Sequence, residues 1–264
     1  MHNDILKIGP VTIHGYGLMI ALGVLAAVLM AGFRAKRKGL SADTVYGLGL
    51  VALIFGFIGA KLLYLIVEWK YFIEAPLRAL SGQGFVVYGG IVGGVIAAIL
   101  YCRKKKIRFM RYFDLVAPSL ALAQGFGRIG CLLAGCCYGR ETDSLWGIVF
   151  SHSLYAPNGV RLIPTQIMHS AANFLIAGIL LLYARKDRKA GRVGAMYLIL
   201  YSVGRFTIEF FRGDYRGYVG VLSTSQFISI FTLLIGIGLF FVDKLPSIGK
   251  RGQGGDSDSE KNEG

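Results

Sequence analysis

The chain has 264 residues, of which 54% are hydrophobic and 17% are charged, and its mean hydropathy is +0.56. A water-soluble domain of this length needs more polar surface to cover its core, so these values exclude an ordinary soluble protein. The net charge of +14 does not indicate nucleic-acid binding, because the basic residues occur in short bursts between long apolar stretches. We therefore expect an all-α polytopic membrane protein.

The apolar stretches are long enough to cross a membrane as α-helices, which takes about 20 predominantly apolar residues. Helices are favoured because a backbone in lipid must satisfy its own hydrogen bonds, and the period-two alternation of barrel strands is not seen. In chain order, the seven predicted spans are Val11–Phe33, Thr44–Val67, Phe85–Tyr101, Phe113–Leu133, Pro164–Tyr183, Gly194–Phe211 and Ser223–Val242.

The domain organisation is predicted from the N-terminal and C-terminal segments of the chain. The first apolar stretch begins at Val11 without the basic region or cleavage site of a signal peptide, so we expect it to be retained. Residues 1–245 are predicted to form one integral membrane domain. Residues 246–264 are polar, charged and rich in glycine and serine, which predicts a disordered tail.

The orientation is predicted by the distribution of lysine and arginine. Basic residues concentrate after the first, third and fifth predicted helices, at Arg34, Lys36, Arg37 and Lys38, at Arg103, Lys104, Lys105, Lys106, Arg108 and Arg111, and at Arg185, Lys186, Arg188, Lys189 and Arg192. With seven alternating helices, these loops and the C-terminus share one side. The positive-inside rule makes that side cytoplasmic and places the N-terminus outside.

Two predicted helices carry ionisable residues toward the outer side. Such residues are costly in a membrane, so they indicate a candidate functional site. Arg128 lies in a Gly-Arg-Ile-Gly stretch at a membrane edge. Its planar guanidinium suits a phosphate, to which it can donate two parallel hydrogen bonds, although it could instead extend to the interface without a ligand.

Arg205 and Glu209 are four residues apart, with Tyr201 four before Arg205, so all three share one helix face. We interpret Arg205 as an anion-binding arginine held by its own carboxylate, the alternative being an ion pair that joins helices.

Two further segments leave alternatives open. Tyr16 lies in a His-Gly-Tyr-Gly stretch, and tyrosine is common in interfacial belts. Tyr88 precedes four glycines, among them Gly89 and Gly90. These glycines can allow close helix packing, or packing together with backbone N–H groups offered to an anion. They do not form a nucleotide loop, because no Lys-Ser/Thr pair and no βαβ pattern accompany them.

Three cysteines follow Arg128 closely: Cys131, Cys136 and Cys137. Their spacing lacks the paired C-x-x-C arrangement of zinc sites, and His152 and His169 are not placed to complete one, so we predict no metal site. A disulfide from Cys131 to either of the other two is an open alternative. The default interpretation is that they are small packing residues.

An ordered set of motifs carries a resemblance to one family. The chain resembles the prolipoprotein diacylglyceryl transferases of bacteria over nearly its whole length, through IGPVTIHGYGLM (8–19), GG-x-x-G from Gly89, FDLVAP (113–118), GRIG (127–130) with Gly135 and Gly139, PTQ (164–166) and YSVGRFTIEFFR (201–212). The resemblance implies transfer of the diacylglyceryl group of phosphatidylglycerol to the lipobox cysteine thiol of a prolipoprotein. Glycerol phosphate is released, at the outer face of the cytoplasmic membrane, and no metal or cofactor is required.

The resemblance also implies roles for individual residues. Arg128 and Arg205 match the family's two important arginines, and Tyr16 and Tyr201 match its active-site tyrosines. We therefore predict Arg128, Arg205, Tyr88 and Tyr201 as catalytic residues. The predicted phosphatidylglycerol-binding residues are Tyr16, Arg128, Gly89, Gly90, Gly139, Arg205 and Glu209.

Several positions depart from the family pattern. Tyr88 stands where the family commonly has the histidine that is its presumed base, and a phenol is a poor base at neutral pH. Cys131, Ala134 and Cys136 replace the asparagines and the glutamate that follow the first arginine. His169 follows Met168 where the family has Tyr-Glu, and we hypothesise that it restores proton transfer.

These departures indicate a divergent branch and leave two rivals. The first is a related lipid transferase with a different donor or acceptor. The second is a non-enzymatic lipid transporter, which is disfavoured because the polar residues concentrate at the outer side and no matching cluster lies in the inner half. Small-solute transport is disfavoured further, because no inverted repeat of broken helices is apparent.

Overall fold

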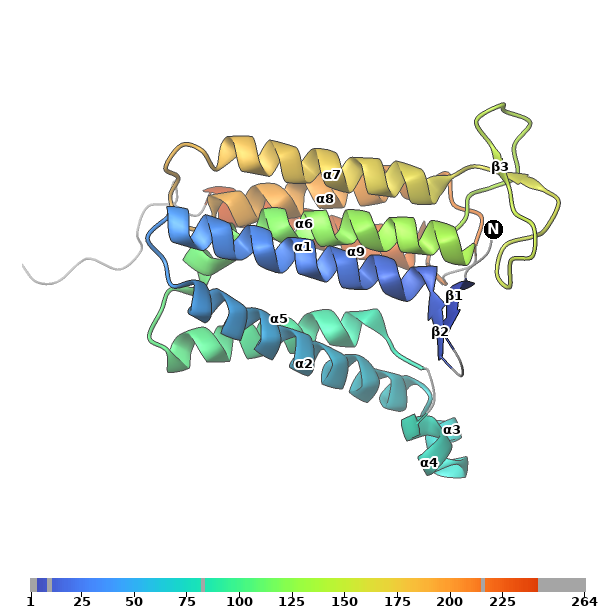
Figure 1. Ribbon diagram of the computed structural model, residues 1–264, viewed down its shortest axis with the longest axis horizontal. Helices are drawn as coiled ribbons and strands as arrows, with labels where there is room; N and C mark the ends of the chain where they lie inside the picture. The colour runs from blue at the N-terminus through green and yellow to red at the C-terminus, as the bar shows by residue number, and fades with distance from the viewer. Residues whose placement is uncertain (1–3, 9–10, 82–83, 215–216, 242–264) are drawn as a thin grey trace, which may run out of the picture.

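The computed structural model describes residues 4–8, 11–81, 84–214 and 217–241, and the predicted tail, residues 246–264, lies outside them. Within this part of the chain, long helices dominate (Figure 1). They are α1 (Gly15–Arg37), α2 (Ala42–Val67), α5 (Val87–Lys104), α6 (Phe109–Ala134), α7 (Thr165–Tyr183), α8 (Arg192–Glu209) and α9 (Thr224–Phe241). The short elements are α3 (Trp69–Glu74), α4 (Pro76–Ser81) and the antiparallel strand pairs β1–β2 (Asp4–Ile8, Val11–His14), β3–β4 (Ile148–Val149, Arg161–Leu162) and β5–β6 (Tyr218–Val219, Leu222–Ser223).

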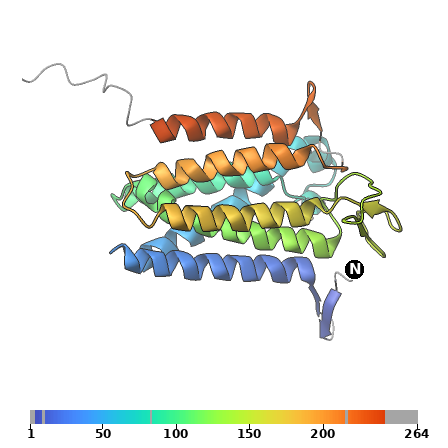
Figure 2. The ribbon, with the colours of Figure 1, turned by 90° about the horizontal axis from the view of Figure 1, so that it is seen from above.

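The fold class predicted from the sequence is confirmed. Six of the described helices, α1, α2, α5, α6, α7 and α9, are long and apolar enough to cross a membrane. The remaining long helix, α8, carries Arg192, Arg205 and Glu209, and it packs against α9, α7 and α6 (Figure 2). The count of seven spans and the orientation of the termini therefore stay predictions.

The predicted start of the first helix is wrong. Val11–His14 is strand β2, paired antiparallel with β1, and helix α1 begins only at Gly15. The run of Val11, Thr12 and Ile13 is β-branched, and such residues favour an extended backbone over a helix. A count of apolar residues does not distinguish a strand from a helix, so the predicted first span included strand β2 together with helix α1.

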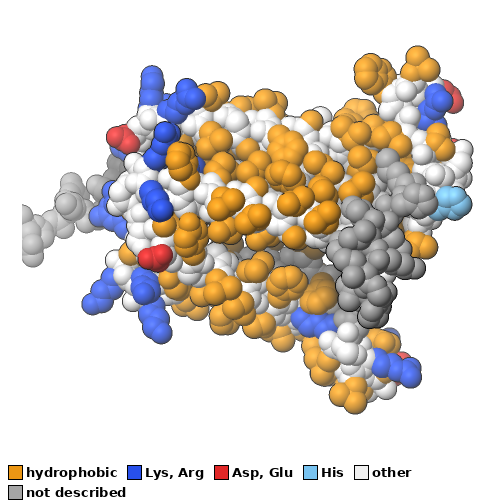
Figure 3. Space-filling view, in the orientation of Figure 1, with side chains coloured by type: hydrophobic (Ala, Val, Ile, Leu, Met, Phe, Trp, Pro, Cys, Tyr) orange, Lys and Arg blue, Asp and Glu red, His pale blue; other side chains and the backbone are white. Residues whose placement is uncertain are grey.

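The two ends of the helix bundle differ in charge. Lysine and arginine side chains gather at one end, where α1 and α5 finish with basic last turns (Figure 3). The strand pairs and the α3–α4 segment lie at the opposite end (Figures 1 and 2). This second end is called the strand end below.

Packing divides the bundle into a helix pair and a larger group. Helices α2 and α5 pack on each other, whereas α6 packs on α1 and α7, and α8 packs on α9. Near the basic end, a cluster that includes Ala35, Leu48, Cys102 and Leu115 joins α1, α2, α5 and α6. At the start of α8, the Asp114 carboxylate of α6 accepts backbone N–H groups from Gly191 at 2.6 Å and Gly194 at 2.7 Å. These bonds satisfy donors that a helix N-terminus leaves without an intrahelical partner, and they fix α8 against α6.

Candidate active site

Arg205 forms the centre of a buried polar cluster between α7, α8 and α9. Its Nη2 lies 3.0 Å from Glu209 Oε2 and donates to Ser225 Oγ at 2.6 Å. Its Nη1 lies 3.0 Å from His169 Nε2. Only 8% of the arginine and 7% of Glu209 are exposed, so the charges need each other to remain buried. The predicted arrangement of Arg205 and Glu209 on one helix face is confirmed.

The carboxylate of Glu209 is itself held in place. Its Oε1 accepts a hydrogen bond from Ser223 Oγ at 3.1 Å, and the Ser223 backbone N–H donates to Gln226 Oε1 at 3.0 Å. Both partners come from the β6–α9 junction. Partners of this kind fix the orientation of a charged group before any ligand arrives.

His169 of α7 is buried against Arg205. Because a guanidinium can only donate hydrogen bonds, Nε2 of His169 must accept, and the ring is neutral with its proton on Nδ1. The lone pair that would take a substrate proton is thus already engaged by Arg205. The hypothesis that His169 accepts the proton remains untested, and the geometry favours a role in orienting Arg205.

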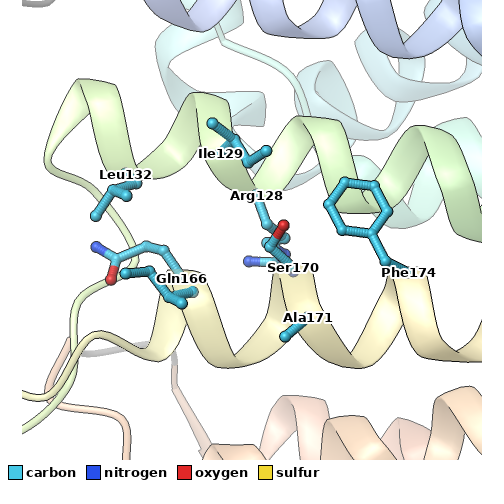
Figure 4. A pocket seen from close by; sticks show the side chains of 8 residues that line it. Arg128, Ile129, Leu132, Gln166, Ser170, Ala171 and Phe174 are labelled. Carbon is cyan, nitrogen blue, oxygen red and sulfur yellow. The ribbon is translucent and has the colours of Figure 1, made fainter.

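Arg128 of α6 lines a cavity of about 270 Å³ between α6 and α7. Figure 4 shows its side chain extending from α6 toward Ser170 on α7. The other lining residues include polar Gln166 and apolar Ile129, Leu132 and Phe174. Among the residues that the structure describes, no carboxylate or hydrogen-bond acceptor is paired with Arg128, in contrast to Arg205. The guanidinium is therefore available to an anion, and the apolar lining suits acyl chains.

A third arginine, which is not among the predicted site residues, belongs to this region. Arg212 follows α8, is 6% exposed, and donates to both oxygens of Asp214 at 2.7 and 2.6 Å. Arg128, Arg205 and Arg212 all lie within electrostatic range of His169. The three-residue spacing from Glu209 to Arg212, nearly one helical turn, was the available sequence signal.

Two of the predicted tyrosines lie beside the arginines. Tyr16 of α1 packs on α6 at Gly130, where a Cβ would lie 3.2 Å from its ring, and it is within electrostatic range of Arg128. Tyr201 lies one turn before Arg205, with its ring 5.8 Å from that of Tyr197. Tyr16 on α1 and Tyr201 on α8 thus lie within electrostatic range of Arg128 and Arg205, respectively.

The predicted residues on α5 have different neighbours. Gly89 and Gly90 face α2: a Cβ on Gly89 would lie 2.5 Å from Leu63 Cβ, and one on Gly90 would lie 3.1 Å from the carbonyl oxygen of Gly56. Tyr88 is 38% exposed at the start of α5. Of the two interpretations left open, helix packing thus has structural support, while anion contact stays a prediction.

Gly139 joins the loop after α6 to the end of α8. Its backbone forms an antiparallel bridge with Arg212, and its N–H donates to the carbonyl oxygen of Ile163 at 3.0 Å. A Cβ here would lie 2.5 Å from that oxygen and 2.8 Å from the carbonyl oxygen of Phe211, so a larger residue would separate the two segments. Gly139 therefore supports the site through the backbone.

The cysteines converge in a way that their spacing did not indicate. The sulfur atoms of Cys131, Cys136 and Cys137 all lie within 4.8 Å of one another, and all three are unbridged. Gly135, with φ of 71°, ends α6 and reverses the chain, which returns the Cys136–Cys137 pair to Cys131. Hydrogen bonds with Cys131 and Cys137, together with burial, raise the pKa of the Cys136 thiol. The default interpretation of these residues as small packing residues is therefore incomplete, because the three thiols form one cluster.

The sequence model of the prolipoprotein diacylglyceryl transferase family matches residues 3–242. The phosphatidylglycerol–prolipoprotein diacylglyceryl transferase of Clostridium tetani is 53% identical over 234 residues, which cover 88% of this chain and 94% of the relative. A second such transferase, from Clostridium perfringens, is 48% identical over 88% of this chain and 92% of its own. The phosphatidylglycerol–prolipoprotein diacylglyceryl transferase of Finegoldia magna is 34% identical over 84% of this chain and 88% of its own.

Proposed function

The chain belongs to the prolipoprotein diacylglyceryl transferase family, and from this premise we propose that it transfers the diacylglyceryl group of phosphatidylglycerol to the lipobox cysteine thiol of a prolipoprotein. The protein is a bacterial membrane transferase of lipoprotein biosynthesis. The proposed product is a thioether on the cysteine, and the proposed leaving group is glycerol phosphate.

The observation that carries this proposal is that the guanidinium of Arg128 lines a largely apolar cavity, within electrostatic range of the Arg205 guanidinium that Glu209 holds. In the reaction, the acceptor sulfur attacks the glyceryl carbon that bears the phosphoryl oxygen. The C–O bond breaks and its electron pair stays on that oxygen, so negative charge grows on the phosphate. Preorganised cationic donors in a site without water stabilise such charge strongly.

Each predicted site residue has a role in this proposal. Arg128 binds the phosphate directly, and Arg205, held by Glu209, supplies the second positive charge. Tyr16 and Tyr201 orient the headgroup from either side. Tyr88, with Gly89 and Gly90 behind it on α5, borders the path of the acceptor, and Gly139 holds the loop between Arg128 and Arg212.

The proposed location is the cytoplasmic membrane of a bacterium, with the site toward the outer face. The basic end of the bundle supports this orientation, because positively charged loops remain on the cytoplasmic side. Arg128 lies near the C-terminal end of α6 and Gln166 near the N-terminal end of α7, which places the cavity toward the strand end. A lipid in the outer leaflet would reach it sideways.

A second candidate is a transferase that uses another lipid donor or another acceptor. Tyr88 in place of the family's histidine, and cysteines in place of its polar residues after Arg128, favour it. Both candidate functions use the phosphate-binding arginines. They differ in the lipid donor or in the acceptor that enters the site.

The experiment is mass spectrometry of a lipobox peptide after incubation with the purified protein and phosphatidylglycerol vesicles. We expect a diacylglyceryl mass gain on the cysteine that Arg205→Ala abolishes and that Arg185→Ala, on the exposed basic loop, leaves unchanged. No gain with phosphatidylglycerol, but a gain with phosphatidylethanolamine vesicles, would support the second candidate. No gain with any donor, from protein that unfolds cooperatively, would refute both.

A further inference from the structure

The three-cysteine cluster is built into the wall of the candidate active site. Gln166 lines the cavity and its Nε2 donates to the carbonyl oxygen of Cys136 at 2.8 Å. Thr165 Oγ1 donates to the carbonyl oxygen of Cys137 at 2.8 Å. The start of α7 therefore fixes the backbone of both loop cysteines, while Cys131 is fixed by the last turn of α6.

The backbone of this loop is unusual at Cys137. Its φ is 62°, in the left-handed region that a non-glycine residue adopts only at some cost in free energy. Such conformations persist where the surroundings over-determine them, and they concentrate at ligand sites. A packing role alone does not require the left-handed conformation of Cys137. This conformation contributes to the convergence of the three sulfurs.

The geometry suits one thiophilic cation. In a tetrahedral zinc site with Zn–S bonds of about 2.3 Å, the sulfurs lie about 3.8 Å apart. The three sulfurs here are all within 4.8 Å of one another, so binding requires only a small contraction. Arg128 and Tyr16 lie within electrostatic range of the thiols, and the guanidinium would balance the excess negative charge of three thiolates around a dication.

We propose that Cys131, Cys136 and Cys137 bind one Zn²⁺ ion, whose fourth position takes the acceptor thiol of the transfer reaction. Three protein ligands with one exchangeable position are the pattern of catalytic rather than structural zinc. A thiol that coordinates zinc is deprotonated, so the ion would supply the activation that Tyr88 cannot. This second part rests on the proposed function, whereas the metal site stands without it.

The atoms balance as follows. On loading, the three cysteine S–H protons pass to solvent. The acceptor thiol then binds as a thiolate and releases its own proton to water. Its sulfur forms the bond to the glyceryl carbon while the C–O bond breaks onto the phosphate oxygen. The resulting thioether is a weak zinc ligand and leaves, which frees the fourth position.

Co²⁺ is the probe for the metal site, because thiolate ligation gives it intense charge-transfer and visible bands. The full chain is titrated without oxygen in phosphatidylcholine nanodiscs. We expect one equivalent of thiolate-bound Co²⁺, lost in Cys131→Ser, Cys136→Ser and Cys137→Ser. The matched control is Cys102→Ser, on α5 near the basic end, which should retain the spectrum. Absence of thiolate bands in folded, reduced protein, or a disulfide between any two of the three, would overturn the proposal.

The fourth position is tested with a lipobox peptide. A cysteine peptide should shift the Co²⁺ spectrum and its serine analogue should not. Removal of the metal by a chelator should lower transfer from phosphatidylglycerol at least tenfold, and Zn²⁺ should restore it. Unchanged transfer by metal-free protein would refute thiol activation and leave the transferase proposal intact. Thiolate bands that respond to the peptide, in protein that transfers nothing with or without Zn²⁺, would support the site and count against the proposed function.

Discussion

The α2–α5 pair and the α6–α9 group are held together by different means. Helices α2 and α5 approach through glycines: a Cβ on Gly93 would lie 2.6 Å from the carbonyl oxygen of Phe55, and one on Gly94 would lie 3.2 Å from that of Ala52. Among the described residues, neither helix buries a polar or charged side chain. The α6–α9 group buries many, with Arg205, Glu209 and His169 among them. In a membrane the first arrangement provides close van der Waals packing, whereas in the second the buried charges of Arg205 and Glu209 need each other.

This difference indicates that the α2–α5 pair has a structural role and that the α6–α9 group carries the chemistry. A buried arginine and carboxylate are costly in lipid and are retained where they act on a ligand or a path. A glycine contact between helices needs no such reason. We therefore propose that the α6–α9 group binds the phosphate, and we regard α2–α5 as a close-packed pair that carries Tyr88 at the start of α5, toward the strand end.

The largest expected effect comes from the guanidinium of Arg128, which has no charge partner among the residues that the structure describes. Arg128→Ala should lower transfer about 10²–10³-fold, the loss typical when one preorganised donor to a developing anion is removed. Arg128→Lys, which keeps the charge but loses the planar fork, should recover part of the rate. Transfer of diacylglycerol to a lipobox peptide measures both. The matched control is Arg103→Ala, on the exposed last turn of α5, and an equal loss in that variant would remove the distinction between the two regions.

Next is the carboxylate that holds Arg205. Glu209→Gln leaves a buried arginine without its counter-charge, which should destabilise the protein by about 3 kcal/mol and lower transfer as Arg205 loses its orientation. Thermal unfolding in detergent and the transfer assay together measure the two effects. Glu74→Gln, on the exposed short helix α3, is the control. Unchanged stability in Glu209→Gln would mean that the ion pair contributes little to the α6–α9 group.

The third prediction tests which of its two roles Gly90 has. Its Cβ in Gly90→Ala would lie 3.1 Å from the carbonyl oxygen of Gly56, so we expect a loss of about 1–2 kcal/mol of stability with an unchanged KM for phosphatidylglycerol. Gly49→Ala on α2, where a Cβ has nothing within 4 Å, should be neutral. A raised KM with unchanged stability would instead assign Gly90 to anion contact and extend the binding site onto α5.

The parts of the site that the sequence predicted are those set by local geometry. Arg205 and Glu209 meet because residues four apart lie on one helix face, whatever surrounds the helix. The long helices follow from apolar length, which the bilayer fixes. The first helix start was misplaced because Val11, Thr12 and Ile13 lie close before a long apolar stretch, and a count of apolar residues does not register that all three are β-branched.

The parts that escaped prediction depend on how distant segments pack. His169 and Ser225 meet Arg205 only because α7 and α9 both lie against α8, and nothing in their spacing indicates this. The three thiols meet because Gly135 reverses the chain and the start of α7 fixes the loop. A spacing rule drawn from C-x-x-C sites could not anticipate either contact.

The smallest predicted effect concerns one of these contacts within the α6–α9 group. Ser225→Ala removes the hydroxyl that accepts a hydrogen bond from Arg205 at 2.6 Å. A single hydrogen bond of this kind contributes about 1 kcal/mol, so transfer should fall only about fivefold, because Glu209 and His169 still hold the guanidinium. The control is Ser229→Ala, one turn further along α9, whose hydroxyl donates to the backbone oxygen of Ser225 at 2.8 Å. If the two variants lose activity equally, the effect belongs to packing of α9, and Arg205 is positioned by Glu209 and His169 alone.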